Sequence, residues 1–108
     1  MQAVLSNSGT KEIQNTKAQL HTLFERLENA DNTTKNSIEN DIVNFGTSAI
    51  DFLIDKLTGS KGIQRGVAAM SLIRIGESSI TPLKQLADVN KSCNWVANYI
   101  IQEINGTF

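Results

Sequence analysis

The sequence has very few residues that could carry covalent or metal chemistry. It contains one cysteine, Cys93, and one histidine, His21, so it can form no internal disulfide and offers no zinc-binding spacing. A lone cysteine is typical of a reducing setting, and we expect the chain to be cytoplasmic. The sequence has no glycine-rich phosphate loop and no carboxylate-rich loop for calcium or magnesium. We therefore predict no catalytic residue, no metal site and no cofactor.

The sequence also lacks long apolar runs and an excess of charge of one sign. No stretch approaches the roughly 18 consecutive apolar residues of a membrane-spanning helix, and the first residues do not resemble a signal peptide. The 10 basic and 11 acidic residues give a net charge of −1, which provides no field to attract a phosphate backbone. We therefore expect neither a membrane nor a nucleic acid as a partner. Residues 1–10, rich in Ser, Asn, Gln and Gly, are expected to form a flexible N-terminal segment.

What is present is the composition of one globular domain with an internal repeat. The 108 residues are 40% hydrophobic and 19% charged, which is enough apolar surface for a packed core. The clearest copy of the repeat is a segment with one apolar face at helical spacing, ended by a glycine. Its positions are Arg65, Ala68, Leu72, Ile75 and Gly76.

The same pattern recurs about thirty residues earlier and later, which is the spacing of a repeat protein. Each copy is preceded by a second apolar helical pattern, so we divide residues 11–108 into repeats over 11–46, 47–76 and 77–106. The matching positions in the other two copies are Lys35, Ile38, Ile42, Phe45 and Gly46, and then Asn94, Ala97, Ile101 and Ile104, with Asn105 and Gly106 in the terminator region.

Three repeats of two helices each predict six helices in an all-α fold. Ser48, with Asp51 three residues later, and Ser78 or Ser79 are candidate helix starts. A start at Ser78 or Ser79 places Pro82 within the first turn, where its missing N–H is tolerated. Because one amphipathic pair cannot bury both of its apolar faces, we expect three antiparallel pairs stacked on one another.

The run from Arg65 to Gly76, with Ala68, Ala69 and Leu72 between them, resembles the second helix of HEAT repeats. It is most similar to the short bacterial type found in phycobilisome-lyase-like HEAT proteins. The resemblance covers roughly residues 20–105 and implies a right-handed α-solenoid of three HEAT-like helix pairs. HEAT arrays mostly serve as scaffolds, so the resemblance specifies a fold more strongly than a function.

The resemblance also assigns structural roles to individual residues. Pro82 matches the proline that often stands in the first helix of the family, and Gly46 and Gly76 end second helices. In the family, an aspartate after the first helix and a basic residue at the start of the second form an internal ladder. The ladder positions here are Asp88, Arg65 and Lys35, which match it, and Asn29, Gly59 and Asn94, which do not. The resemblance implies that Arg65 binds a carboxylate or the carbonyls at a helix end.

In such a solenoid the second helices line the concave side, and their exposed positions form columns. Residues spaced by four lie near one helix face, and Trp, Tyr, Arg and Met are enriched at protein interfaces. We therefore predict that Trp95 and Tyr99 belong to a partner-binding surface, although both aromatic residues are also suited to capping the open end of the solenoid. The predicted partner-binding residues are Met70, Arg74, Trp95, Tyr99, Asn40 and Glu103.

The leading prediction for function is a non-catalytic scaffold or interaction module that binds a protein or peptide through this concave face. A first alternative is a phycobilin-lyase-like or lyase-accessory protein, whose aromatic groove would hold a tetrapyrrole near Arg74. A second alternative is an assembly subunit that forms a homo-oligomer through its C-terminal end. The sequence names neither the partner nor the pathway.

Overall fold

In the computed structural model, the described part of the chain covers residues 15–106, and all of its regular structure is helical. Six helices and no strand occur in this range, which confirms the predicted all-α fold and its helix count. The flexible segment expected over residues 1–10 lies outside the described residues. The helices cover residues 15–26, α2 (Asn32–Asn44), α3 (Ile50–Gly59), α4 (Gly62–Ile75), α5 (Ile80–Val89) and α6 (Asn94–Asn105).

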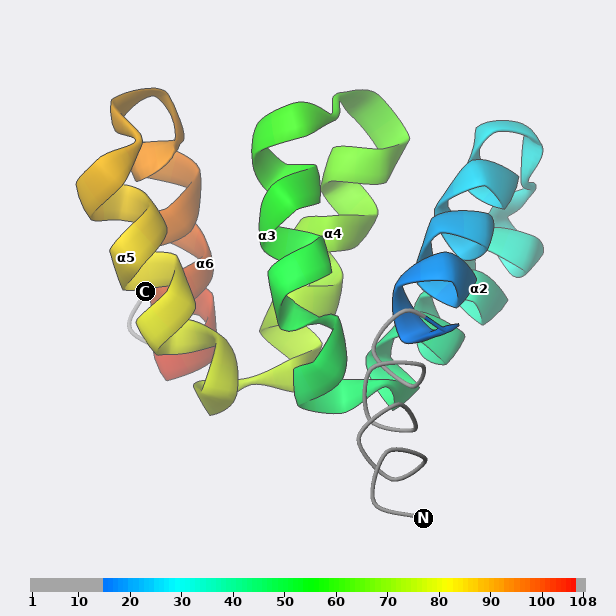
Figure 1. The fold of residues 1–108 in the computed structure, drawn as a ribbon, viewed down its shortest axis with the longest axis horizontal. Helices are drawn as coiled ribbons and strands as arrows, with labels where there is room; N and C mark the ends of the chain where they lie inside the picture. The colour runs from blue at the N-terminus through cyan, green and yellow to red at the C-terminus, as the bar shows by residue number, and fades with distance from the viewer. Residues whose placement is uncertain (1–14, 107–108) are drawn as a thin grey trace, which may run out of the picture.

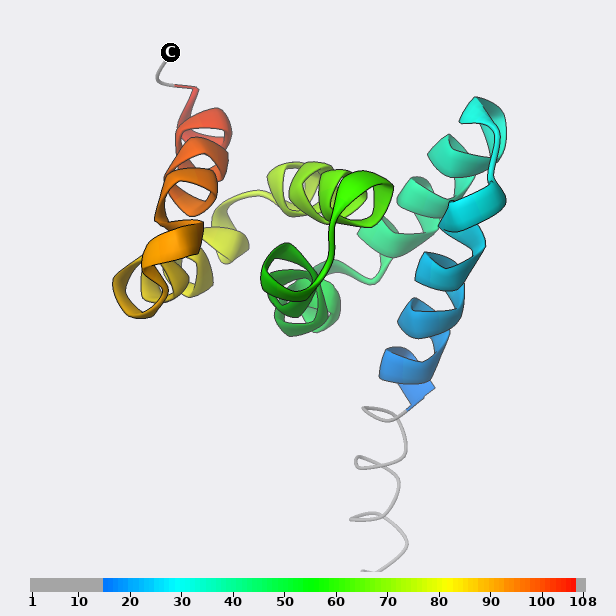
Figure 2. The ribbon, with the colours of Figure 1, turned by 90° about the horizontal axis from the view of Figure 1, so that it is seen from above.

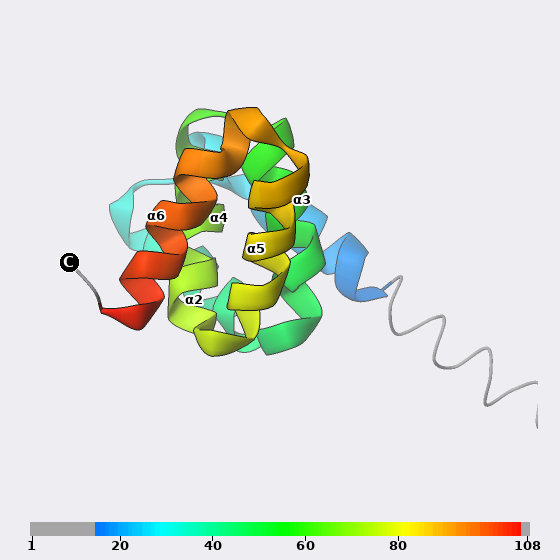
Figure 3. The ribbon, with the colours of Figure 1, turned by 90° about the vertical axis from the view of Figure 1, so that its left-hand side faces the viewer.

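The helices form two layers. Successive helices run in alternate directions, so that α3 lies beside α4 and α5 lies beside α6 (Figure 1). Seen along the long axis, α2, α4 and α6 lie on one side, and α3 and α5 lie on the other (Figure 3). The helix over residues 15–26 is on the same side as α3 and α5 (Figure 2). Within the first layer, α4 contacts both α2 and α6, which makes α4 the central helix.

The core follows the repeated apolar positions. Ala68 and Leu72 of α4 are fully buried, and Ile75 is partly buried against the same core. The residues that match Leu72 in the other repeats, Ile42 of α2 and Ile101 of α6, are buried as well. Burial of large aliphatic side chains is the main favourable term in folding, so one continuous core holds the six helices together.

Glycines end α4 and shape the turn after α2. Gly46 has φ 61°, and Gly76, the residue after α4, has φ 92° and ψ −141°. Both backbones lie where an L side chain is strained, and the angles of Gly76 are close to a region that only glycine adopts readily. The chain can therefore reverse sharply after α4 and begin the next helix within a few residues.

Ser79 is the N-cap residue of α5, as predicted, but neither it nor Ser48 caps a helix through its side chain. Short 3₁₀ turns, η2 (Gly46–Ala49) and η3 (Glu77–Ser79), run directly into α3 and α5. Ile50 N–H donates to the Thr47 carbonyl, so the backbone of the turn satisfies a donor that a side-chain cap would otherwise satisfy. The Ser48 hydroxyl instead donates to the Phe45 carbonyl, at 2.6 Å. The buried Ser79 hydroxyl donates to the Leu72 carbonyl, at 3.1 Å, and ties the start of α5 to α4.

Pro82 lies in the first turn of α5, which begins at Ile80. One side-chain cap that sequence reasoning missed is Asp31, whose Oδ1 accepts the Thr34 N–H at 2.8 Å at the start of α2. This backbone hydrogen bond stabilises the carboxylate and lowers the pKa of Asp31. None of the helices in residues 15–106 combines the length and apolarity needed to cross a membrane.

Candidate binding face

Large apolar side chains are exposed on α4 and α6. Trp95 is 64% exposed, Met70 is 48% exposed and Tyr99 is 47% exposed. The cause is helical periodicity: when Ala97 and Ile101 face the core, Trp95 and Tyr99 fall on the outer surface of α6. We call the outer surface of α2, α4 and α6 the binding face, because every predicted partner-binding residue belongs to one of these helices.

Arg65 and Trp95 join α4 to α6 on the binding face. The guanidinium carbon of Arg65 lies over the Trp95 ring, 5.6 Å from the ring centroid, within range of a cation–π contact. No acidic side chain in residues 15–106 forms an ion pair with Arg65. The resemblance implied such a carboxylate, but the position where the family carries an aspartate in this repeat is Gly59. Arg65 therefore contacts an aromatic ring of the next repeat instead.

Arg74 is held on the other side of α4. Its Nη1 donates to Oε2 of Glu39 on α2 at 2.9 Å, and the Glu39 side chain is only 17% exposed. Asn40, the next residue of α2, is exposed. The structure thus joins Arg74 to α2, whereas Trp95 and Tyr99 lie on α6. The predicted residues share one layer of helices, but Arg74 is engaged in a separate contact.

Tyr99 and Glu103 form a hydrogen-bonded pair one turn apart on α6. The phenol donates to Oε1 of Glu103 at 3.0 Å. This bond favours the neutral phenol, and the negative charge of Glu103 disfavours the phenolate, so both effects raise the pKa of Tyr99. The phenol of Tyr99 is therefore held in place above a carboxylate.

The ladder of charged residues is replaced in part by amides. Among the described residues, neither Lys35 nor Asp88 forms an ion pair. Asn94, the equivalent of Arg65 in the third repeat, donates from Nδ2 to the Ala87 carbonyl at 3.1 Å. Gln64 donates from Nε2 to the Phe24 carbonyl at 3.2 Å. Sequence analysis noted that Asn94 departs from the charged pattern but assigned no role to its amide, and it did not consider Gln64, which precedes Arg65.

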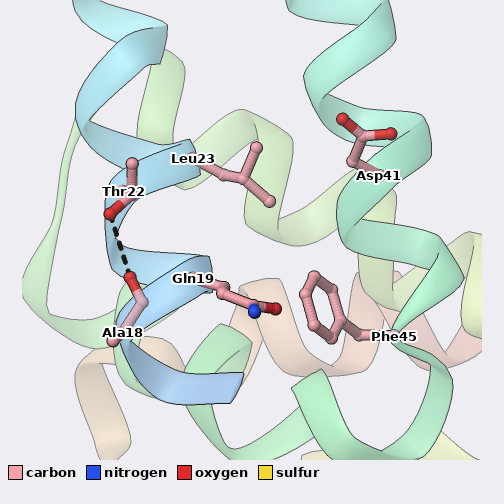
Figure 4. Close-up of a pocket in the computed structure, with 6 residues that line it drawn as sticks. All are labelled: Ala18, Gln19, Thr22, Leu23, Asp41 and Phe45. Atoms are coloured by element: carbon pink, nitrogen blue, oxygen red, sulfur yellow. Dashed lines mark hydrogen bonds between the residues drawn. The ribbon is translucent and has the colours of Figure 1, made fainter. Parts of the chain in front are cut away.

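A pocket of about 460 Å³ lies between the helix over residues 15–26 and α2. Leu23 and Phe45 point into the space between the two helices, with Asp41 on the α2 side (Figure 4). The Thr22 hydroxyl donates back to the Ala18 carbonyl, at 3.1 Å, and so makes no hydrogen bond across the pocket. Sequence reasoning missed this pocket because Leu23 fitted the repeated apolar pattern, which predicts core rather than surface. The full lining is Ala18, Gln19, Thr22, Leu23, Asp41 and Phe45.

Groups capable of metal or nucleophilic chemistry are dispersed. In residues 15–106, no three His, Cys, Asp or Glu side chains come together as metal ligands would. His21 lies on the surface with its Nε2 3.8 Å from Glu25, whereas Cys93 is buried at the start of α6. What the arrangement offers chemically is an aromatic and cationic surface. In comparisons with known proteins, no family model, no curated protein and no solved structure matches the chain.

Proposed function

We propose that the chain is a right-handed α-solenoid of three HEAT-like helix pairs and that it binds a protein or peptide, without catalysis, through the binding face. The observation that carries the proposal is the exposure of Met70, Trp95 and Tyr99 on neighbouring helices of one layer. Exposed aromatic and thioether side chains of this kind are the usual anchors of protein interfaces.

The repeat assignment is supported by recurring backbone and core features. Gly46, Gly76 and Gly106 follow α2, α4 and α6 at thirty-residue intervals, and each has a positive φ. The contacts of α4 with both α2 and α6, and of α3 with α5, are those expected when each pair packs only on its neighbours. Solution NMR tests this part: nuclear Overhauser contacts should join α4 to both α2 and α6, and contacts between α2 and α6 along their lengths would contradict it.

The exposure of Trp95 favours binding over capping. A capping side chain has to cover core atoms, and it loses most of its own exposed surface in doing so. Trp95 keeps 64% of its surface in solvent, while its neighbours Val96 and Ala97 are buried. The core below α6 is thus covered by aliphatic side chains, and the Trp95 ring is available to a partner.

Substitution of Trp95 tests the proposal. Trp95→Ala should change the free energy of unfolding by less than about 1 kcal/mol, as for other surface substitutions. It should weaken binding of peptides selected on the wild-type chain by about 2 kcal/mol or more, because buried tryptophans are frequent hot spots. Isothermal calorimetry and urea denaturation of the same variant measure the two effects.

The matched control is Val89→Ala. Val89 is the most exposed large apolar side chain in residues 15–106, at 82%, but it ends α5 in the opposite layer. Its truncation should leave both stability and peptide affinity nearly unchanged. A Trp95→Ala protein that is strongly destabilised but binds normally once folded would instead identify Trp95 as a cap.

A further inference from the structure

Arg65 differs from the other arginine of the binding face in what its guanidinium contacts. Arg74 donates to Glu39 at 2.9 Å, so its charge is already compensated by a carboxylate of the chain. Arg65 lies over the Trp95 ring, and no acidic side chain in the described range pairs with it. A cation–π contact with a ring does not occupy all five N–H donors of a guanidinium, and no other partner of the Arg65 side chain occurs among the described residues. The remaining donors are therefore available for a ligand.

The position of Arg65 makes it suitable for recognising a carboxylate. Its side chain is partly buried and is held against Trp95, so less conformational entropy is lost when it binds than for a fully mobile surface cation. A guanidinium presents its donors in a planar fork that matches a carboxylate. Beside this fork stands the exposed ring of Trp95, which offers apolar contact area.

The charged residues near Arg65 are mostly positive. The turns over residues 60–61 and 90–93, which precede α4 and α6, lie at the same end of the molecule (Figure 1). These turns contain two exposed lysines, Lys61 and Lys91, and no acidic residue. Glu77 and Glu103, by contrast, belong to the opposite end, in η3 and near the C-terminus of α6. At the Arg65 end, the three cations Arg65, Lys61 and Lys91 outnumber Asp88, the exposed acid in the last turn of α5, so this end favours an acidic ligand.

Resting on the proposed function, we infer that the partner is an acidic peptide segment, with an aspartate or glutamate next to a large apolar residue. The carboxylate binds the guanidinium of Arg65, and the apolar side chain packs on the ring of Trp95. The two contacts explain together why an exposed aromatic ring and an arginine without a carboxylate partner occur side by side.

The test starts from a displayed library of random peptides, selected on the full chain. The enriched peptides should carry an acidic residue next to an apolar one. One such peptide is then synthesised together with a version in which the acid is replaced by its amide. Trp95 is the single tryptophan of the chain, so its fluorescence reports binding at the site itself. The amide version should bind about tenfold more weakly, and added salt should weaken the acidic version.

Arg65→Gln should cause the same loss of about tenfold for the acidic peptide and should abolish the difference between the acid and the amide. Arg65→Lys keeps the charge but not the planar fork, so its affinity for the acidic peptide should lie between those of the wild type and Arg65→Gln. The control is Lys84→Gln. Lys84 is an exposed residue of α5 in the other layer, so removing its positive charge should leave the peptide affinity unchanged. Urea denaturation of each variant ensures that folded proteins are compared.

The outcomes separate this inference from the function on which it rests. Enrichment of neutral or basic peptides whose binding is lost in Trp95→Ala would overturn the acidic partner and retain the binding module. The acidic partner is also overturned if Arg65→Gln binds the acidic peptide as well as the wild type does. If no peptide is enriched at all, or if enriched peptides bind Trp95→Ala normally, the proposed function itself fails.

Discussion

Two lines of contact on the binding face are chemically different, although both are formed by neighbouring helices of one layer. The α2/α4 seam, where α2 meets α4, is bridged by the ion pair of Glu39 and Arg74. The α4/α6 seam, where α4 meets α6, is bridged by Arg65 over Trp95. The first contact satisfies both of its charged partners. The second leaves hydrogen-bond donors and an aromatic surface facing outwards.

The two seams differ on the surface but are alike in the core. Beneath both seams the same core positions are occupied by aliphatic residues, of which Leu72 is the central one. Above the core, the residues at the exposed positions differ between the seams. They form an ion pair at the α2/α4 seam and leave an exposed aromatic ring at the α4/α6 seam. Trp95 stands where the second repeat has Gly66, so the available surface depends on the difference between repeats and not on their shared pattern.

The largest expected effect concerns the shared core. Leu72→Ala should lower the free energy of unfolding by about 2–5 kcal/mol, because Leu72 is fully buried in the central helix. Met70→Ala, two residues away but 48% exposed, is the control and should cost less than about 0.5 kcal/mol. If one core supports both seams, hydrogen exchange should show α2 and α6 losing protection together. Loss confined to one helix would mean that the seams fold independently.

The next largest loss of stability is expected for the glycines in the turns that follow α2 and α4. Gly76→Ala should cost about 1–3 kcal/mol, because φ 92° with ψ −141° is a conformation that an L residue adopts only under strain. Gly46→Ala should cost less, about 1 kcal/mol, since its φ of 61° is within the left-handed range that other residues visit. An added Cβ meets no atom within 4 Å at either glycine, so the cost is one of the backbone alone. Equal midpoints in thermal denaturation would contradict the difference.

The repeated pattern predicted the helices because periodic burial is a local property of the sequence. Ala68, Leu72 and Gly76 could be placed correctly from their spacing and chemistry alone. The contact partner of Arg65 could not be predicted in this way, because it depends on which side chain of the next repeat lies beside Arg65. A pattern search aligns residues with their equivalents, whereas Arg65 and Trp95 meet although they are not equivalents. Ser79 was correctly placed before α5, but its side chain does not cap the helix and Ser48 is not a cap, because carbonyls of the 3₁₀ turns already accept the first N–H donors.

A smaller effect is expected for the ion pair that closes the α2/α4 seam. A double-mutant cycle of Glu39→Ala and Arg74→Ala should give a coupling free energy of about 0.5–1 kcal/mol. The Glu39 side chain is well covered, but Arg74 is 39% exposed, so solvent screens much of the attraction. The coupling should fall as salt is added. The contact between His21 and Glu25, exposed on both sides at 3.8 Å, is the comparison pair and should give almost none.

The smallest effect concerns Tyr99, at the edge of the α4/α6 seam, and it is read from a pKa. Tyr99 is the only tyrosine, so the near-ultraviolet absorbance of tyrosinate titrates this residue alone. The hydrogen bond to Glu103 and the charge of its carboxylate should hold the pKa of Tyr99 above its ordinary value of about 10. Glu103→Gln should bring the pKa back down, whereas Glu77→Gln, an exposed acid in η3, should not move it.

The direction of the stability change follows from the sign of the Tyr99 shift. Because folding raises the pKa of Tyr99, the bond stabilises the chain below the pKa of the unfolded state and is lost as pH rises through the folded value. Tyr99→Phe should remove this part of the alkaline pH dependence while keeping the exposed ring. If the wild-type chain titrates at or below the ordinary value, the phenol does not bind Glu103 in solution. The α4/α6 seam would then offer two adaptable rings rather than one held by a carboxylate and one in cation–π contact with a guanidinium.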